Sequence, residues 1–354
     1  MRTESFEFLR ALQETPSPSG FEQPVQRLVR QYMKPVADQI HTDVHGNCIV
    51  ALNPKGRPRV MLAGHCDQIG LMVKYITDQG FIHFGSIGGI DASVLPGQRM
   101  TVLANKGPVE GVIGRKAIHL MKPEDRNKAK IELGDLWLDI GAKNKADAEK
   151  RVSVGDPITF KLYLQPLGRG LAASPGFDDK VGTFVVMEAL RLVAKRKPKC
   201  AIFAVSTVQE ELGLRGARTS CFGIDPLVGI AVDLNHAADY PGAEKKVTGD
   251  LKLGKGPIIE IGPNINPAVG ELLLDVAKKK KIPYQRSGEP AATGTDANAI
   301  QITRAGVAAG LLSVPNRYMH TPVEVINLTD LDNSAKLLAE TCLRIDEKMD
   351  FIPK

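Results

Sequence analysis

The sequence predicts an α/β protein in which a mostly parallel central sheet with flanking helices is interrupted by a smaller all-β domain. Strand and helix patterns alternate over residues 172–313, as they do when helices cover a parallel sheet. Residues 72–165 instead combine short alternating apolar runs with many glycines. A chain of 354 residues has room for both parts. We therefore expect an α/β domain made of residues 1–71 and 166–354, with a β-rich domain inserted at 72–165.

The first α/β segment can be followed element by element. The chain is expected to open with a short helix at about residues 4–14, followed by a loop rich in proline and serine. Ser19 and Glu22 have the spacing of a capping box, which predicts a second helix running to about Ala37. Apolar runs then predict strands at 47–52 and 60–63, joined by a turn at 54–57.

The inserted region is expected to close with a strand at 155–164, after which helices return. Helices are predicted at about 179–196 and 330–349, and Asn266 with Pro267 marks the start of another. Between them, apolar runs predict strands at 200–208, 227–233, 257–261 and 306–313.

Charge and composition exclude several classes of function. The net charge of +6 is modest, and no aromatic residues interleave with the basic runs at 195–199 and 278–281, which argues against a nucleic-acid surface. No apolar run approaches the roughly 20 residues that span a bilayer, and no signal peptide is expected. The five cysteines are widely spaced, which favours reduced thiols and a cytoplasmic location.

Carboxylates and histidines gather where the predicted strands end. Glu210 and Glu211 follow a buried run, and adjacent carboxylates there are costly without a partner such as a cation. On extended backbone their side chains would point in opposite directions, so that one binds metal and the other faces the substrate as a general base. Other candidates lie at strand ends or turns, where a sheet presents ligands to a crevice: His65, Asp67, Asp178, Asp179, Asp233 and His320. The whole set indicates a hydrolase with two metal ions.

Each candidate also has a purely structural interpretation. A histidine at a strand end or in a surface loop is commonly a hydrogen-bonded structural residue, which applies to His65 and His320. Asp178 and Asp179 open a predicted helix and qualify as N-caps, whereas Asp233 qualifies as a turn residue.

The order and spacing of the motifs resemble the dinuclear-metal aminopeptidases of metallopeptidase family 42. This family includes tetrahedral, glutamyl and deblocking aminopeptidases, and some members are described as endoglucanase M. The resemblance runs nearly end to end and implies a zinc-peptidase-like fold. It rests on these segments: Ser19–Glu22, Gly64–Gly70, Gly176–Gly182, Gln209–Ala217, Val232–Asp233, Gly294–Ala297 and Met319–Pro322.

The resemblance implies a ligand set for two divalent ions in each chain. Asp178 would bridge the two ions, His65 and Asp233 would complete one site, and Glu211 and His320 would complete the other. Mixed nitrogen and oxygen ligands suit zinc best here, with cobalt or manganese as alternatives.

The resemblance also implies an activity, which is the removal of N-terminal residues from short peptides. Glu210 would be the general base, and Asp67 would orient the imidazole of His65. Thr295 and Asp296 would lie near the first side chain of the substrate. Relatives use the inserted domain, which is PDZ-like, to dimerise, and some dimers assemble into a dodecamer, so we expect a homo-oligomer.

Two other functions compete with this hypothesis. A glycoside hydrolase of the endoglucanase type needs two carboxyl groups facing each other across the scissile bond, roughly 5–10 Å apart. Two adjacent glutamates that point in opposite directions are badly placed for that chemistry. A non-catalytic peptide-binding scaffold would have no use for a complete ligand set accompanied by a base.

Overall fold

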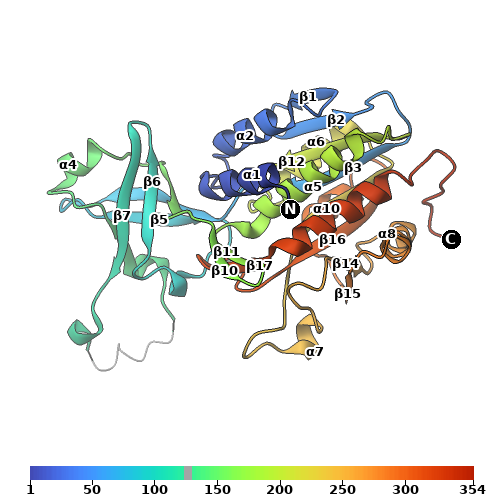
Figure 1. The fold of residues 1–354 in the computed structure, drawn as a ribbon. Helices are drawn as coiled ribbons and strands as arrows, with labels where there is room; N and C mark the ends of the chain where they lie inside the picture. The colour runs from blue at the N-terminus through green and yellow to red at the C-terminus, as the bar shows by residue number, and fades with distance from the viewer. Residues whose placement is uncertain (123–129) are drawn as a thin grey trace.

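The body of the molecule is an α/β structure, in agreement with the predicted fold class. The computed structural model describes residues 1–122 and 130–354. An eight-stranded sheet runs through the body, and the neighbours among its four central strands are parallel (Figure 1). In spatial order the strands are β1 (Gln39–Thr42), β2 (Cys48–Leu52), β12 (Ala201–Thr207), β3 (Arg59–His65), β13 (Val228–His236), β16 (Ala308–Asn316), β14 (Ile258–Ile261) and β15 (Gln285–Gly288).

Helices cover both faces of this sheet, which explains why its central strands are mostly buried and apolar up to their carboxyl ends. The larger core cluster lies between the sheet and one helical layer, made of α1 (Thr3–Glu14), α2 (Gln23–Met33), α5 (Phe177–Ala194), α8 (Pro267–Lys280) and α10 (Leu328–Cys342). A second cluster lies beneath α6 (Arg215–Ile224) and α9 (Asp296–Gln301) on the other face. α5 is buried along almost its whole length because it packs between the sheet and α10.

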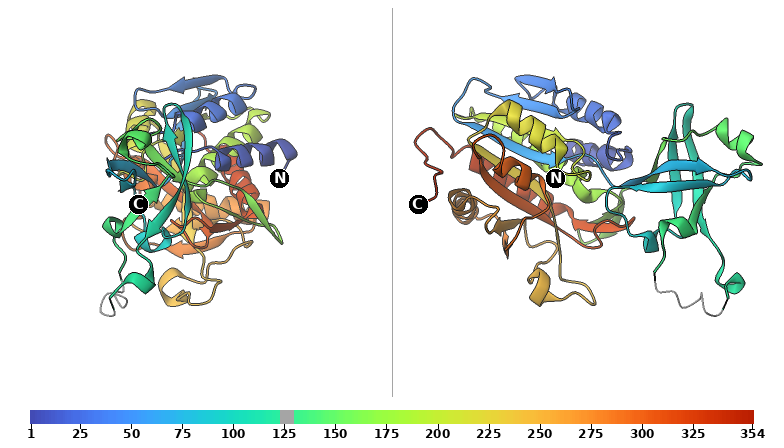
Figure 2. Two further views of the ribbon diagram at one scale, coloured as in Figure 1. Left: turned by 90° about the vertical axis from the view of Figure 1, so that its left-hand side faces the viewer. Right: turned by 180° about the vertical axis from the view of Figure 1, so that it is seen from behind.

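A closed β-barrel stands at one end of this body, and the C-terminus lies at the opposite end (Figures 1 and 2). Its strands, in order around the barrel, are β4 (Gly70–Ile76), β5 (Ile82–Ile87), β8 (Leu136–Asp139), β7 (Gly107–Arg115), β6 (Arg99–Ala104) and β9 (Pro157–Phe160). The barrel has its own apolar core. It also carries the short helix α4 (Lys145–Glu149).

Two small features complete the described chain. A three-stranded sheet joins β10 (Gln165–Gly168), β11 (Leu171–Ser174) and β17 (Glu324–Asn327), and α7 (Lys245–Thr248) projects from the body. Among the described residues, no helix combines the length and the apolar character needed to cross a lipid bilayer. The five cysteines all lie within the described ranges and are buried free thiols.

Several boundaries differ from the sequence predictions. The second helix ends at Met33 rather than Ala37, because Pro35 has no backbone N–H to continue the hydrogen bonds of the helix. The last helix spans Leu328–Cys342 rather than 330–349, and the chain beyond it turns so that Ile345 and Phe351 join the larger core. The strand predicted at 306–313 is Ala308–Asn316.

The capping box predicted at the start of the second helix is wrong. The helix begins after Glu22, without a side-chain cap. Ser19 instead donates a hydrogen bond to the carboxylate of Asp67 at 2.5 Å. Glu22 accepts from the backbone N–H groups of Gly20 and Gln209, so it ties this loop to the segment after β12. Both side chains therefore serve contacts that are distant in sequence.

Candidate metal centre and active site

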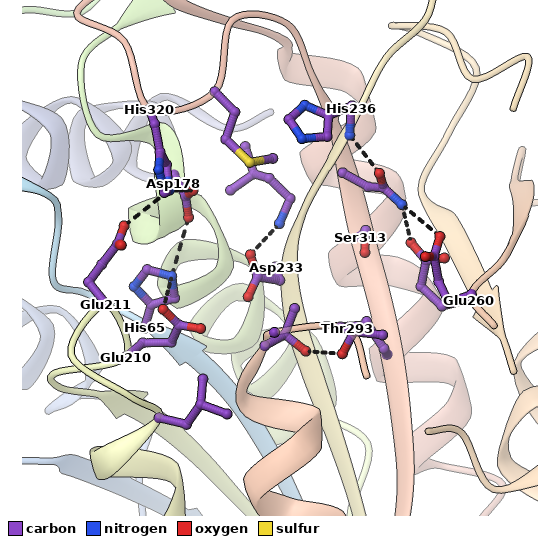
Figure 3. Close-up of a pocket in the computed structure, with 18 of the residues that line it drawn as sticks. His65, Asp178, Glu210, Glu211, Asp233, His236, Glu260, Thr293, Ser313 and His320 are labelled. Atoms are coloured by element: carbon purple, nitrogen blue, oxygen red, sulfur yellow. Dashed lines mark hydrogen bonds and ion pairs between the residues drawn. The ribbon is translucent and has the colours of Figure 1, made fainter. Parts of the chain in front are cut away.

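The candidate residues converge at the carboxyl ends of the central strands, as Figure 3 shows. His65 is the last residue of β3, Glu210 and Glu211 follow β12, and Asp233 lies in β13. β3 pairs in parallel with both β12 and β13, so these three strand ends are neighbours. Asp178 enters from the start of α5, where its backbone is not yet helical.

Asp178 lies between two histidines. Its Oδ1 is 3.2 Å from His65 Nε2, and its Oδ2 is 3.1 Å from His320 Nε2. His320 belongs to the loop after β16, so the carboxylate joins two parts of the chain that are far apart in sequence. One oxygen directed at each imidazole is the arrangement that a bridging ligand requires.

Two groups of possible ligands share this aspartate. The first is His65, Asp178 and Asp233, and the second is Asp178, Glu211 and His320. Within each group, ligand atoms from the three residues lie within 4.8 Å of one another. Each group combines an imidazole nitrogen with two carboxylates, a donor set that fits zinc and similar divalent ions.

The electrostatics of the site favour cations. Burial and the neighbouring Asp178 raise the pKa of Glu211 to about 7. Burial, again with the charge of Asp178, also raises the pKa of Asp233 well above its usual value. The hydrogen bond to Asp178 raises the pKa of His320 to about 9. Carboxylates that resist ionisation beside histidines that retain protons indicate an excess of negative charge, which divalent ions would neutralise.

Glu210 stands apart from the two ligand groups but close to them. Its Oε2 lies 3.8 Å from His65 Nε2, and its side chain lines the same pocket. Burial raises the pKa of Glu210 to about 10, with the charges of Asp233, Asp296 and Asp178 adding to the effect. Cations bound at the neighbouring groups would lower this pKa toward neutrality, where a general base works best.

The two glutamates do not lie on extended backbone, contrary to the prediction. They occupy a bend, because the fully buried carboxylate of Asp67 accepts the backbone N–H groups of both, from Glu210 at 3.0 Å and from Glu211 at 3.2 Å. The side chains still separate, since Glu210 approaches His65 while Glu211 Oε1 lies 3.4 Å from His320 Nε2.

Asp67 and the adjacent backbone also fix the imidazole of His65. His65 Nδ1 lies 3.1 Å from the backbone oxygen of Asp67 and 3.4 Å from its Oδ1. An imidazole whose Nδ1 is held by these oxygens presents Nε2 to the pocket, as metal-binding histidines require. The backbone N–H of His65 donates to Asp179 Oδ2, and Asp179 Oδ1 accepts from the N–H of Gly182. Asp179 is therefore the aspartate that accepts a backbone N–H group near the start of α5.

The barrel takes part in the site. The backbone oxygen of Gly89, which follows β5, lies 2.9 Å from Nδ1 of His320. This contact directs Nε2 of His320 toward Asp178 and Glu211. The neighbouring Gly88 has a φ of +75°, and a Cβ there would lie 3.1 Å from the Glu211 carboxylate. A barrel loop therefore closes one side of the second ligand group.

Sequence reasoning missed Glu324, which accepts hydrogen bonds from the backbone of two residues of the second ligand group, Asp178 and His320. This buried carboxylate accepts the backbone N–H of Asp178 at 3.0 Å through Oε2 and that of His320 at 2.9 Å through Oε1. Burial and the charge of Asp178 raise the pKa of Glu324 to about 8. The only local signal was its position four residues after His320.

The centre opens into a pocket of about 630 Å³. Thr295, at the N-cap of α9, is one of its lining residues. Asp296 is only 1% exposed, and its Oδ2 accepts a 2.6 Å hydrogen bond from Thr207 Oγ1 behind the pocket surface. Burial raises the pKa of Asp296 to about 6.

An α/β sheet that presents two histidine–carboxylate groups in one pocket is typical of hydrolases with two-metal sites, a class that includes aminopeptidases. The family model of the M42 glutamyl aminopeptidases matches residues 46–337. A lysyl aminopeptidase of Pyrococcus furiosus is 38% identical over 350 residues, which are 98% of this chain and 99% of the relative. The chain therefore belongs to the M42 aminopeptidase family.

Solved structures agree with this assignment. The TET aminopeptidase of the marine sediment archaeon Thaumarchaeota archaeon SCGC AB-539-E09 superimposes with a TM-score of 0.93 at 35% identity, covering 98% of both chains. The TET1 peptidase of Pyrococcus horikoshii, which can assemble into a tetrahedron or a large octahedral shell, gives 0.86 at 31% identity. That match covers 96% of this chain and all of the other.

Proposed function

We propose that this chain removes N-terminal residues from short peptides at a dinuclear metal centre, with Glu210 as the general base. The observation that carries the proposal is the position of Asp178, which offers one oxygen to each of two ligand groups. His65 and Asp233 would complete one site, and Glu211 and His320 the other. When bound, the two ions would lower the pKa of a water molecule and polarise the scissile carbonyl.

The residues of the chain supply the remaining chemistry. Glu210 takes a proton from the attacking water and passes it to the leaving amine, and bound ions would bring its raised pKa down toward the range in which a general base works. Asp67 fixes the positions of Glu210 and His65 relative to each other, because its carboxylate accepts the backbone N–H of Glu210 and lies 3.4 Å from Nδ1 of His65. The walls of the pocket hold the first residue of the peptide, and Thr295 is one of the side chains available for this. Asp296 would have an indirect role, because its hydrogen bond with Thr207 would fix the position of the neighbouring Thr295 at the pocket surface.

Metal dependence tests the proposal. Protein stripped by a chelator should lose activity toward a panel of aminoacyl chromogenic substrates and regain it with zinc, cobalt or manganese. Metal analysis of the active protein should approach two ions per chain. Glu211→Gln should weaken one of the two sites. A fully active protein that holds no metal would end the proposal, and cleavage of glycosides instead of peptides would favour the glycoside hydrolase.

We also propose that residues 72–165 form a separate domain at a two-fold interface, between the α/β segments 1–71 and 166–354. The closed barrel with its own core supports this division, although 123–129 lie outside the described residues. The assembly would be a dimer or a dodecamer built from dimers. Light scattering that gave a monomer at micromolar concentration, with metal present, would rule it out. Five buried thiols favour a reducing compartment such as the cytoplasm.

Family membership leaves the preferred N-terminal residue open. The family model carries a glutamyl description, whereas the Pyrococcus furiosus relative is a lysyl aminopeptidase. These names imply opposite charges on the side chain that the pocket receives. The N-terminal residue that this chain prefers in its substrates must therefore be inferred from the side chains that line its own pocket.

A further inference from the structure

The pocket extends from the candidate centre across the sheet to a second group of acidic side chains. Asp233 on β13 pairs with Ser313 on β16, and β14 lies next to β16. Glu260 on β14 pairs in turn with Ser287 on β15, and Glu289 follows that strand. Glu260 and Glu289 both line the pocket, and Glu260 lies on the side away from His65 and His320 (Figure 3).

Glu260 is buried but incompletely satisfied. Its side chain is 1% exposed, and its Oε1 accepts a 2.9 Å hydrogen bond from Asn235 Nδ2. Its Oε2 has no hydrogen-bond partner of good geometry among the described residues, although the hydroxyls of Ser313 and Ser287 lie near enough to the carboxylate to lower its pKa. A buried acceptor without a donor costs free energy, so a carboxylate of this kind in the wall of a pocket favours a ligand that brings a donor.

Glu289 strengthens the negative charge of this wall. Its Oε1 accepts from Ser287 Oγ at 2.7 Å and lies 3.5 Å from Asn235 Nδ2, so Asn235 connects the two glutamates. Within the described parts of the chain, no lysine or arginine lines the pocket. His65 and His320 are already engaged by Asp178, far from Glu260 along the wall. The wall therefore carries no lysine or arginine within the described residues, although His236 also lines the pocket.

We propose that Glu260, assisted by Glu289, binds the cationic side chain of the first substrate residue, so that peptides with N-terminal lysine or arginine are preferred. This inference rests on the proposed function, which holds the α-amine and the scissile bond at the metal centre. Glu260 is two strands away from Asp233, about 10 Å across the sheet at the usual strand spacing. It is also two residues further along β14 than Ile258, which pairs with Ser313, so the two side chains are offset by about 7 Å along the strands. The four-carbon stem of lysine suits such a separation, with its ammonium group at the far wall.

Other side chains fit this wall less well. An aliphatic side chain would exclude water from Glu260 Oε2 without supplying a donor. A glutamate would bring a third carboxylate beside two others, and like charges at close range are unfavourable. We therefore expect the order lysine or arginine, then aliphatic residues, then glutamate.

Norleucine supplies the matched substrate, because it is lysine without the terminal ammonium. The values of kcat/KM for lysine and norleucine para-nitroanilides should differ by about tenfold or more in favour of lysine in the wild-type protein. Glu260→Gln should reduce this ratio by about 10- to 100-fold, mainly through loss of lysine turnover. Glu289→Gln should reduce it less. Glu271→Gln, on the exposed face of α8, is the control and should leave the ratio unchanged.

The results separate this inference from the proposed function. Turnover with a preference for norleucine, or a ratio unaffected by Glu260→Gln, would overturn the cationic pocket while leaving the aminopeptidase intact. If the metal-loaded protein hydrolysed no aminoacyl substrate, the proposed function would fail instead. Calorimetric binding of lysinamide and norleucinamide would then test the pocket alone. Tighter binding of lysinamide that depends on Glu260 supports the inference, and equal binding refutes it.

Discussion

Replacing Glu324 by glutamine should weaken the second ligand group without touching any of its three side chains. Glu324 is 2% exposed and accepts two backbone N–H groups, those of Asp178 and His320. Glutamine has nearly the same shape but offers only one acceptor oxygen, and its NH₂ group is a donor. One of the two backbone N–H groups must then face a donor inside the protein.

The size of the effect follows from this geometry. Leaving one buried N–H group without an acceptor costs about 1–3 kcal/mol. Since about 1.4 kcal/mol corresponds to a factor of ten, metal affinity at this group should fall by about 5- to 150-fold. This range matches the usual effect of losing a group that orients metal ligands. The affected residues are Asp178, which both groups share, and His320.

Competition with a chromogenic chelator would measure the metal affinity of the wild type, Glu324→Gln and the exposed control Glu347→Gln. The control should behave as the wild type does. Thermal unfolding of the metal-free proteins would show how much of the cost falls on the fold itself. Wild-type metal affinity together with a wild-type unfolding temperature in Glu324→Gln would refute the reasoning.

Three further predictions concern turnover and specificity. Glu210→Gln should keep its metal but lose about 10²–10⁴-fold in kcat; near-normal turnover with two ions bound would contradict its role as base. Burial, with Glu289 nearby, raises the pKa of Glu260 to about 7, so Glu260 ionises as the pH rises. The lysine-to-norleucine ratio in kcat/KM should therefore increase between pH 6 and 8, since the lysine ammonium stays charged; a flat ratio would count against this. Gly88→Ala should lower turnover by displacing Glu211, whereas Gly107→Ala, also at positive φ but with no described atom within 4 Å of its Cβ, should not; equal losses would point to backbone strain alone.

Much of the fold could be predicted because its signals are local. Apolar runs indicate strands, their alternation with helical patterns indicates the α/β class, and the glycine-rich region indicates an insertion. None of these signals requires knowledge of a contact between distant segments. The positions of His65, Glu210 and Asp233 could be predicted for the same reason, since each comes at the end of an apolar run. Parallel strands place such ends at one edge of the sheet.

Other features depended on contacts between distant segments. The turn at 54–57 connects β2 and β3 in sequence, but β12 lies between them in the sheet. Ser19 and Glu22 resemble a capping box until Asp67 and the backbone of Gln209 come within reach. Strand order and side-chain partners of this kind are decided by long-range packing, which no local pattern records.

The sequence by itself determined the α/β class, the inserted β region and the residue types available for a metal centre, because these depend on short-range periodicity and on side-chain chemistry. Only the tertiary structure decided that Asp178 lies between two histidines, that Glu324 holds both ends of one ligand group, and that Glu260 faces the pocket. Each of these depends on distances between strands and loops that are remote in sequence. Folding sets those distances when it buries the sheet between its helices.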